Sequence, residues 1–158
     1  MVYYETQPFF QGQITLFQSD SKLVFVSLAE NAVEEFHLFY PALDLQPGSV
    51  DAMINFLGYA QNREVDFSYV AFDFLQGTPF QRTVWQFLMS VKVGTTITYQ
   101  DVAFAIKKPN AIRAVATAVG KNPLTIMIPC HRIVPKAGGT GRYRYGEKWK
   151  NELLRHEN

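Results

Sequence analysis

The sequence predicts an α/β (α+β) fold class in two parts: a small strand-rich N-terminal domain (residues 1–76) and a mainly helical C-terminal domain (residues 77–158). In the first part, β-branched and aromatic residues alternate with polar ones, which is typical of strands. In the second part, apolar residues recur at helical spacing. The net charge also changes sign, from −8 over residues 1–78 to +9 over residues 79–158. Such an asymmetry indicates two modules.

The N-terminal part opens with a predicted β-hairpin. Residues 13–17 and 22–28 alternate as strands, and the Gln-Ser-Asp-Ser stretch at residues 18–21 predicts the turn between them. A helix is expected over residues 51–57, with Ser49 as its N-cap.

The end of the N-terminal part carries one more predicted strand, over residues 65–70, where the alternation resumes. The linker to the second part is expected at Leu75–Pro79. His37 has no set of metal ligands around it in the sequence, and we find no catalytic constellation in this part.

Beyond the linker, the pattern predicts three helices. The first covers residues 80–91, whose apolar side chains fall largely on one face, and Gly94 ends it. Thr98 and Asp101 have the spacing of a capping box and open a second helix through Ile106.

The third helix is expected over residues 111–119, with Asn110 as N-cap and Gly120 after its end. Together with the helix before it, it suggests a helix-turn-helix, although an ordinary helical hairpin has the same pattern. Its many alanines suit either close packing against another helix or entry into a narrow groove, with Arg113 in its first turn. The sequence leaves these alternatives open.

Composition limits the class of protein. With 158 residues, 47% of them hydrophobic and 18% charged, the chain can bury a core and is not of the disordered type. No stretch reaches the length of a membrane span and no signal segment is apparent, so we expect a cytoplasmic protein, or a nuclear one in a eukaryote. The basic second half favours a polyanionic partner, and mutual attraction between the two halves is the alternative.

Cys130 is the only cysteine, so it forms no internal disulfide and no cysteine-rich zinc site. It is either a small buried hydrophobic residue, which is the usual role of a free cysteine, or a nucleophile. Pro129 fixes the backbone before it, and His131 and Arg132 follow it. Imidazole and guanidinium groups beside a thiol favour the reactive thiolate, which supports the nucleophile.

A series of different short motifs follows in order along the second half. They are Phe80-Gln81, Val84-Trp85, Ile97–Ala103, Arg113–Ala116, Asn122-Pro123, Ile128–Val134, Gly141, Tyr143, Lys150, Leu153-Leu154 and Glu157. From about Thr78 to the C-terminus, the sequence thereby resembles the O6-alkylguanine-DNA alkyltransferases. The first half matches this family only in size and in its strand-rich character.

The resemblance implies a direct and irreversible transfer of an alkyl group from O6 of guanine to Cys130, with O4 of thymine as a further substrate to consider. His131 would act as the base through a bridging water, and Glu157 would orient it. Asn122 would be a hinge residue that packs between the helix pair and the active-site segment. Tyr143 would donate a hydrogen bond to the leaving oxygen.

The resemblance also implies residues that bind DNA. Tyr99 would help to turn the target nucleotide, and Arg113 would fill the space left in the base stack. Ala114 and Arg132 complete the expected DNA-binding set. The expected partner is double-stranded DNA that contains O6-alkylguanine, the expected protein is a monomer, and no cofactor, metal or membrane is expected.

Three other functions compete with this interpretation. A non-catalytic relative that only binds alkylated DNA would lack the cysteine, whereas Cys130 is present. A cysteine hydrolase would need an oxyanion hole, for which the sequence has no pattern. A transcription regulator would leave residues 129–132 unexplained.

The sequence departs from the family pattern around Tyr143. Arg142 and Arg144-Tyr145 flank it where members of the family often have small or neutral residues.

Overall fold

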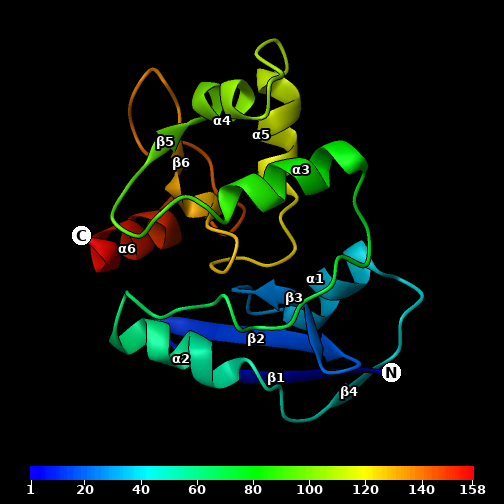
Figure 1. Cartoon of the computed structure of the whole chain (residues 1–158). Helices are drawn as coiled ribbons and strands as arrows, with labels where there is room; N and C mark the ends of the chain where they lie inside the picture. Colours follow the sequence, from blue (N-terminus) through cyan, green and yellow to red (C-terminus); the bar gives the residue numbers. More distant parts are fainter. The chain divides into compact units, whose positions relative to one another are not determined.

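The computed structural model describes all 158 residues. The chain divides into two compact units, Met1–Leu75 and Gln76–Asn158, each with its own buried residues (Figure 1). None of its helices is both long enough and apolar enough to cross a lipid bilayer. The structure contains no group of three or more His, Cys, Asp or Glu side chains that could hold a metal ion.

The first unit is built on a four-stranded sheet with the strand order β3-β2-β1-β4. The strands are β1 (Val2–Phe9), β2 (Gly12–Ser19), β3 (Lys22–Ser27) and β4 (Leu45–Pro47). β1, β2 and β3 pair antiparallel, and β4 lies parallel to β1. The predicted hairpin is confirmed as β2 and β3. Asp20 and Ser21 between them have φ values of +50° and +62°, as a tight two-residue turn requires.

Two helices complete this unit, α1 (Ala32–Phe39) and α2 (Met53–Gln61). α1 packs on the sheet through Phe36, whose ring stacks on Phe17 of β2 with the centroids 4.6 Å apart. Phe25 of β3 meets both rings edge-on, so aromatic contacts between helix and sheet form the centre of this core. The sequence pattern predicts none of β1, β4 and α1.

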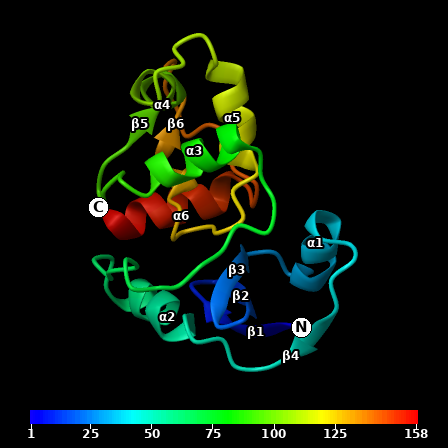
Figure 2. The same cartoon turned by 45° about the vertical axis from the view of Figure 1, so that its right-hand side comes forward.

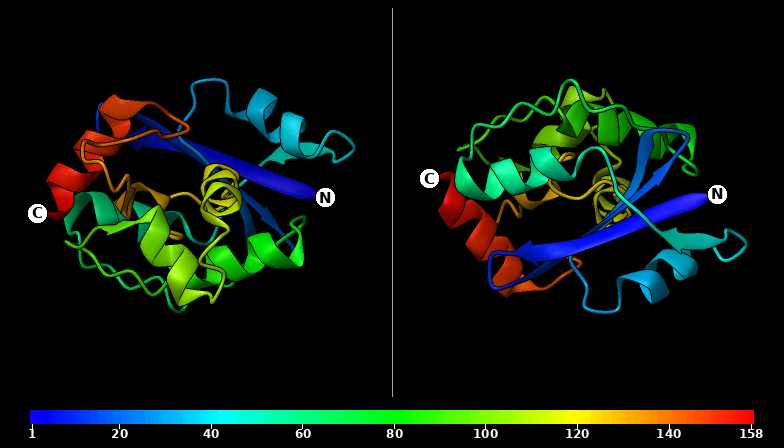
Figure 3. Two further views of the ribbon diagram at one scale, coloured as in Figure 1. Left: turned by 90° about the horizontal axis from the view of Figure 1, so that it is seen from above. Right: turned by 90° about the horizontal axis from the view of Figure 1, so that it is seen from below.

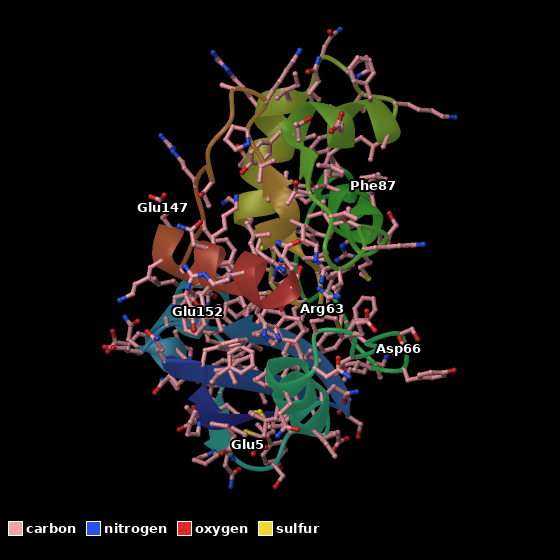
Figure 4. The ribbon with its side chains drawn as sticks, turned by 90° about the vertical axis from the view of Figure 1, so that its left-hand side faces the viewer. Glu5, Arg63, Asp66, Phe87, Glu147 and Glu152 are labelled. Carbon is pink, nitrogen blue, oxygen red and sulfur yellow. The ribbon has the colours of Figure 1, made fainter.

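Two predictions for this unit are wrong. α2 begins at Met53 after Ala52, without a side-chain cap, so Ser49 is not its N-cap. The strand expected over residues 65–70 does not form. Instead, the carboxylate of Asp66, which is labelled in Figure 4, accepts a hydrogen bond of 2.8 Å from the backbone N–H of Ser68. Such a local turn competes with strand pairing.

The second unit begins with α3 (Pro79–Leu88), which replaces the longer helix predicted over residues 80–91. Thr78, expected in the linker, is the N-cap of α3 and forms a capping box with Gln81. α4 (Tyr99–Ala105) starts with the predicted capping box, in which the Thr98 hydroxyl accepts from the Asp101 N–H and the Asp101 carboxylate accepts from the Thr98 N–H. That prediction is confirmed.

α5 (Ile112–Gly120) packs against both α3 and α4. Its N-cap is Ala111 and no side chain caps it, so the prediction of Asn110 as N-cap is wrong. The indole N–H of Trp85 in α3 donates to the carbonyl of Ala118 in α5 at 2.8 Å, inside the core. The helix of small residues therefore packs closely on one side while its other side is exposed.

Four further elements complete the second unit. β5 (Ile97–Thr98) and β6 (Ile133–Val134) lie side by side as a short parallel pair (Figures 1 and 2). The 3₁₀ turn η1 (Cys130–Arg132) leads directly into β6, and α6 (Glu147–Glu157) packs against η1. α6, which the sequence analysis did not predict, ends at the C-terminus in red in Figure 3.

Candidate active site

A buried segment, residues 122–133, positions the cysteine. Asn122 holds the turn at its start: its amide Nδ2 donates to the carbonyl of Ile128 at 2.7 Å, and its Oδ1 accepts from the N–H of Leu124 at 2.9 Å. Within this turn, Ile126 has a φ of +76°, a conformation that is costly for a β-branched residue. Asn122 thus stabilises a strained turn immediately before Pro129 and Cys130.

Cys130 is buried but can be reached from a cavity. Its exposed fraction is 7%, and it lines a cavity of about 410 Å³. Tyr99 at the start of α4, Thr117 and Gly120 of α5, and the loop residues Arg142–Arg144 also line this cavity. A thiol at the wall of a cavity of this kind can meet a small group that enters from outside.

Behind the cysteine, His131 and Arg132 share one carboxylate. Nε2 of His131 lies 2.6 Å from Oε2 of Glu157. Arg132 donates from Nε to Oε1 of Glu157 at 2.8 Å, from Nη2 to Oε2 at 2.9 Å, and from Nη1 to the carbonyl of Val91 at 2.6 Å. His131 and Glu157 are almost completely buried, so this cluster has little contact with solvent.

The environment of His131 keeps its imidazole neutral. Burial lowers its pKa below the usual value, with further lowering from the charges of Arg132 and Lys150, and the hydrogen bond and charge of Glu157 oppose this only in part. A neutral imidazole that donates from Nε2 to Glu157 carries its lone pair on Nδ1. Nδ1 is buried and makes no hydrogen bond to another protein atom, so it can accept a proton.

Lys150 adds a buried cation beside the active segment. Its ammonium donates to the carbonyl of Ile133 at 2.6 Å and to that of Arg142 at 3.2 Å. Burial lowers the pKa of Lys150, and a negative charge on Cys130 acts in the opposite direction. Sequence reasoning noted Lys150 without giving it a role, because nothing local indicates that a lysine on a helix is buried.

Two tyrosines belong to the lining of the cavity. Tyr99 and Tyr143 both line it together with Cys130. The pKa of Tyr99 is raised, mainly by burial and also by the charge of Cys130, while Arg142 opposes the shift. Tyr99 therefore stays protonated at neutral pH and can donate a hydrogen bond.

The residues expected to bind DNA separate into two groups. Arg113 and Ala114 lie exposed in the first turn of α5, where a partner can reach them. Arg132 does not: its side chain is 9% exposed, and Glu157 and Val91 hold its guanidinium inside the unit. The assignment of Arg132 as a DNA contact is therefore corrected. Its guanidinium neutralises the buried carboxylate of Glu157 and is not available to a phosphate.

Comparisons with known proteins agree with this geometry. Residues 79–158 match the family model described as 6-O-methylguanine DNA methyltransferase, DNA binding domain. A probable methylated-DNA–protein-cysteine methyltransferase of Acanthamoeba polyphaga mimivirus is 51% identical over 83 residues, which are 52% of this chain and 55% of the relative. The Saccharomyces cerevisiae (strain S288c) methylated-DNA–protein-cysteine methyltransferase is 44% identical over 88 residues, 56% of this chain and 47% of the relative. The match thus spans about half the length of these curated relatives.

Solved structures are similar over nearly the whole chain. The O6-methylguanine methyltransferase of Mycobacterium tuberculosis superposes with a TM-score of 0.84 at 32% sequence identity, covering 99% of this chain and 93% of that one. The Mycobacterium tuberculosis OGT in complex with DNA gives a TM-score of 0.83 at 30% identity, covering 98% of this chain and 92% of that one.

Proposed function

Because the chain belongs to the 6-O-methylguanine DNA methyltransferase family, we propose that it repairs DNA by transferring an alkyl group from O6 of guanine to Cys130. The observation that carries the proposal is the position of Cys130 at the wall of the cavity. The next residue, His131, is buried and paired with Glu157. A soft sulfur nucleophile is well suited to displacement at a saturated carbon.

The proposed reaction starts with removal of a proton from Cys130. A water bridges the Cys130 thiol and Nδ1 of His131, which accepts the proton while Glu157 stabilises the resulting imidazolium. The unpartnered Nδ1 and the 2.6 Å contact at Nε2 support these roles. A negative charge on Cys130 raises the pKa of Lys150, so Lys150 stands as a cation near an ionised sulfur.

In the transfer step, Sγ of Cys130 attacks the alkyl carbon and a new S–C bond forms as the C–O6 bond breaks. The electron pair of the broken bond stays with guanine, which takes up a proton. Tyr143, a lining residue of the same cavity, donates a hydrogen bond to the leaving oxygen. The proton removed from the thiol balances the one gained by guanine.

The product is a thioether, which is a poor leaving group, so we expect each molecule to react once. The second unit would bind double-stranded DNA, with Arg113 and Ala114 of α5 in the minor groove and Tyr99 beside the turned nucleotide. The target atom lies inside the duplex, which makes extrusion of the base necessary. We propose that the protein acts as a monomer in the compartment that holds the DNA, the cytoplasm or a eukaryotic nucleus.

The test is to incubate the protein with a molar excess of duplex DNA that carries one O6-methylguanine with a radiolabelled methyl group. We expect label to move to protein and to stop at one equivalent. Binding without transfer would favour a non-catalytic reader, and release of label into solution would favour a hydrolase. Turnover beyond one equivalent would contradict a single-turnover transfer.

A further inference from the structure

Arg144 links the loop at the cavity to the end of α5. Its Nη1 donates to the carbonyl of Gly120 at 3.1 Å, and its Nη2 donates to the hydroxyl of Tyr145 at 2.9 Å. Nη2 also lies 3.4 Å from the hydroxyl of the buried Thr125. The guanidinium sits over the Tyr145 ring, 4.9 Å from its centroid. Its position is thus fixed from several sides.

The partner on α5 is a favourable one. Gly120 is the last residue of α5, and the final carbonyls of a helix lack partners within it. A guanidinium there supplies a hydrogen bond and a positive charge at the negative end of the helix dipole. The contact between Arg144 and Gly120 is therefore more favourable than a chance contact at a surface.

The loop of residues 135–146 depends on side-chain contacts for its position. It contains four glycines with positive φ, at positions 138, 139, 141 and 146, and glycine gives a backbone its widest conformational freedom. Side-chain hydrogen bonds that tie it to the rest of the unit include those from Lys150 to the Arg142 carbonyl, from Thr140 to Asn151 and from Arg144 to the Gly120 carbonyl. Of these, the Arg144 tie joins two residues that both line the cavity.

We propose that Arg144 is a specificity-determining residue that limits the size of the O6-alkyl group the cavity accepts, because it ties this loop to the end of α5. The inference rests on the proposed function and names its substrate range. The alkyl carbon must reach Sγ of Cys130, so the rest of a larger group extends into the cavity. A group that exceeds the available space must displace the loop and break the hydrogen bonds of Arg144, whereas a methyl group need not.

The experiment compares two lesions in one duplex, O6-methylguanine and O6-benzylguanine at the same position. The readout is the ratio of the single-turnover rates of benzyl and methyl transfer, in which general effects on DNA binding cancel. We expect Arg144→Ala to raise this ratio by roughly tenfold or more, the usual scale of discrimination by pocket size. Arg144→Lys keeps the charge but loses the planar fork, and its ratio should rise as well.

Arg142→Ala is the matched control, because Arg142 lines the same cavity with an exposed side chain, whereas the hydrogen bond to α5 comes from Arg144. Its ratio should equal that of the wild type. If Arg144→Ala does not fold, as judged by thermal unfolding, Arg144→Lys carries the test. Methyl transfer with an unchanged ratio in the Arg144 variants, or an equal rise in Arg142→Ala, overturns the inference alone. Absence of methyl transfer by the wild type contradicts the proposed function.

Discussion

Glu157 is the residue that compensates the buried charge of Arg132. It accepts hydrogen bonds from both nitrogens of the Arg132 fork that face it and pairs with Nε2 of His131. A carboxylate at this depth is favourable only because the guanidinium neutralises it, and the reverse holds for Arg132. The same contacts fix the imidazole, so stability and proposed chemistry share these atoms.

Replacing Glu157 with Ala should therefore be costly. The change leaves the guanidinium of Arg132 buried without its countercharge, and we expect the free energy of unfolding to fall by about 3–5 kcal/mol. Glu152→Ala, on the same helix, should change it by less than about 0.5 kcal/mol. Urea denaturation of both variants measures this difference. Equal losses would mean that Glu157 is no more than a surface carboxylate.

His131 makes stability depend on pH. Its pKa is lower in the folded protein than in the unfolded chain, so the unfolded chain binds the proton first as the pH falls. The stability of the neutral form is complete above the unfolded pKa of about 6.5 and is lost progressively below it. Compared with His131→Gln, the wild type should lose up to about 1.4 kcal/mol more per pH unit between pH 6.5 and 5. Parallel urea profiles for the two proteins would refute the neutral imidazole.

The roles of single residues differ in how well the surrounding sequence predicts them. Cys130 stands out because it is the only cysteine and because His131 and Arg132 follow it. Glu157 lies 26 residues beyond His131, and no local pattern joins them, so only the family resemblance suggested the pair. The burial of Arg132 was missed for the same reason, since it depends on a carboxylate that is distant in the sequence.

At the scale of elements, α5 presents two faces with different tasks. Val115, Ala118 and Val119 are buried, while Arg113, Ala114 and Thr117 are exposed. Small exposed residues let the helix approach a partner closely, and an arginine at its first turn reaches farthest. This arrangement fits a helix that enters a groove with Arg113 in front.

Arg113→Ala should slow methyl transfer from duplex DNA more than from single-stranded DNA. The side chain is proposed to fill the space of the extruded base, and a single strand has no paired stack to fill. Single-turnover rates on both substrates give the comparison. An equal loss on both would leave Arg113 as an ordinary phosphate contact.

The elements that could be predicted are those bounded by capping or turn residues. The Thr98–Asp101 capping box and the Asp20-Ser21 turn form as their residues indicate. The start of α2 could not be read in this way, because Ala52 precedes it and carries no capping group. The predicted strand at residues 65–70 failed because alternation does not reveal whether a neighbouring strand is available for pairing.

At the scale of the whole molecule, the feature that matters most for binding is the uneven distribution of charge along the chain. The thirteen basic and four acidic residues beyond residue 78 give that part a net charge of +9. Binding through such charge should depend on phosphates and little on base sequence. The division of the chain into Met1–Leu75 and Gln76–Asn158 keeps this charge within one compact unit.

The order of the strands in the sheet could not be predicted from composition. The parallel pairing of β1 with β4, for example, joins segments that are distant in the sequence.

The affinity for undamaged duplex DNA should fall steeply with salt. Two phosphate contacts alone would weaken binding roughly tenfold between 50 and 200 mM monovalent salt, and more contacts steepen the loss. Fluorescence anisotropy with duplexes of unrelated sequence measures how the affinity depends on salt and on base sequence. Binding that ignores salt but discriminates between sequences would argue for readout of base edges by a regulator.

The central claim is that Cys130 itself receives the alkyl group. Intact-protein and peptide mass spectrometry after incubation with O6-methylguanine duplex DNA tests it most directly, with Cys130→Ser as the control. We predict that the wild type gains the mass of one methylene group, as methyl replaces the thiol hydrogen, and that the peptide containing Cys130 carries it. Cys130→Ser should stay unmodified while it still binds DNA. A methyl group on any other residue, transfer by Cys130→Ser, or repaired DNA beside an unmodified protein would contradict the account.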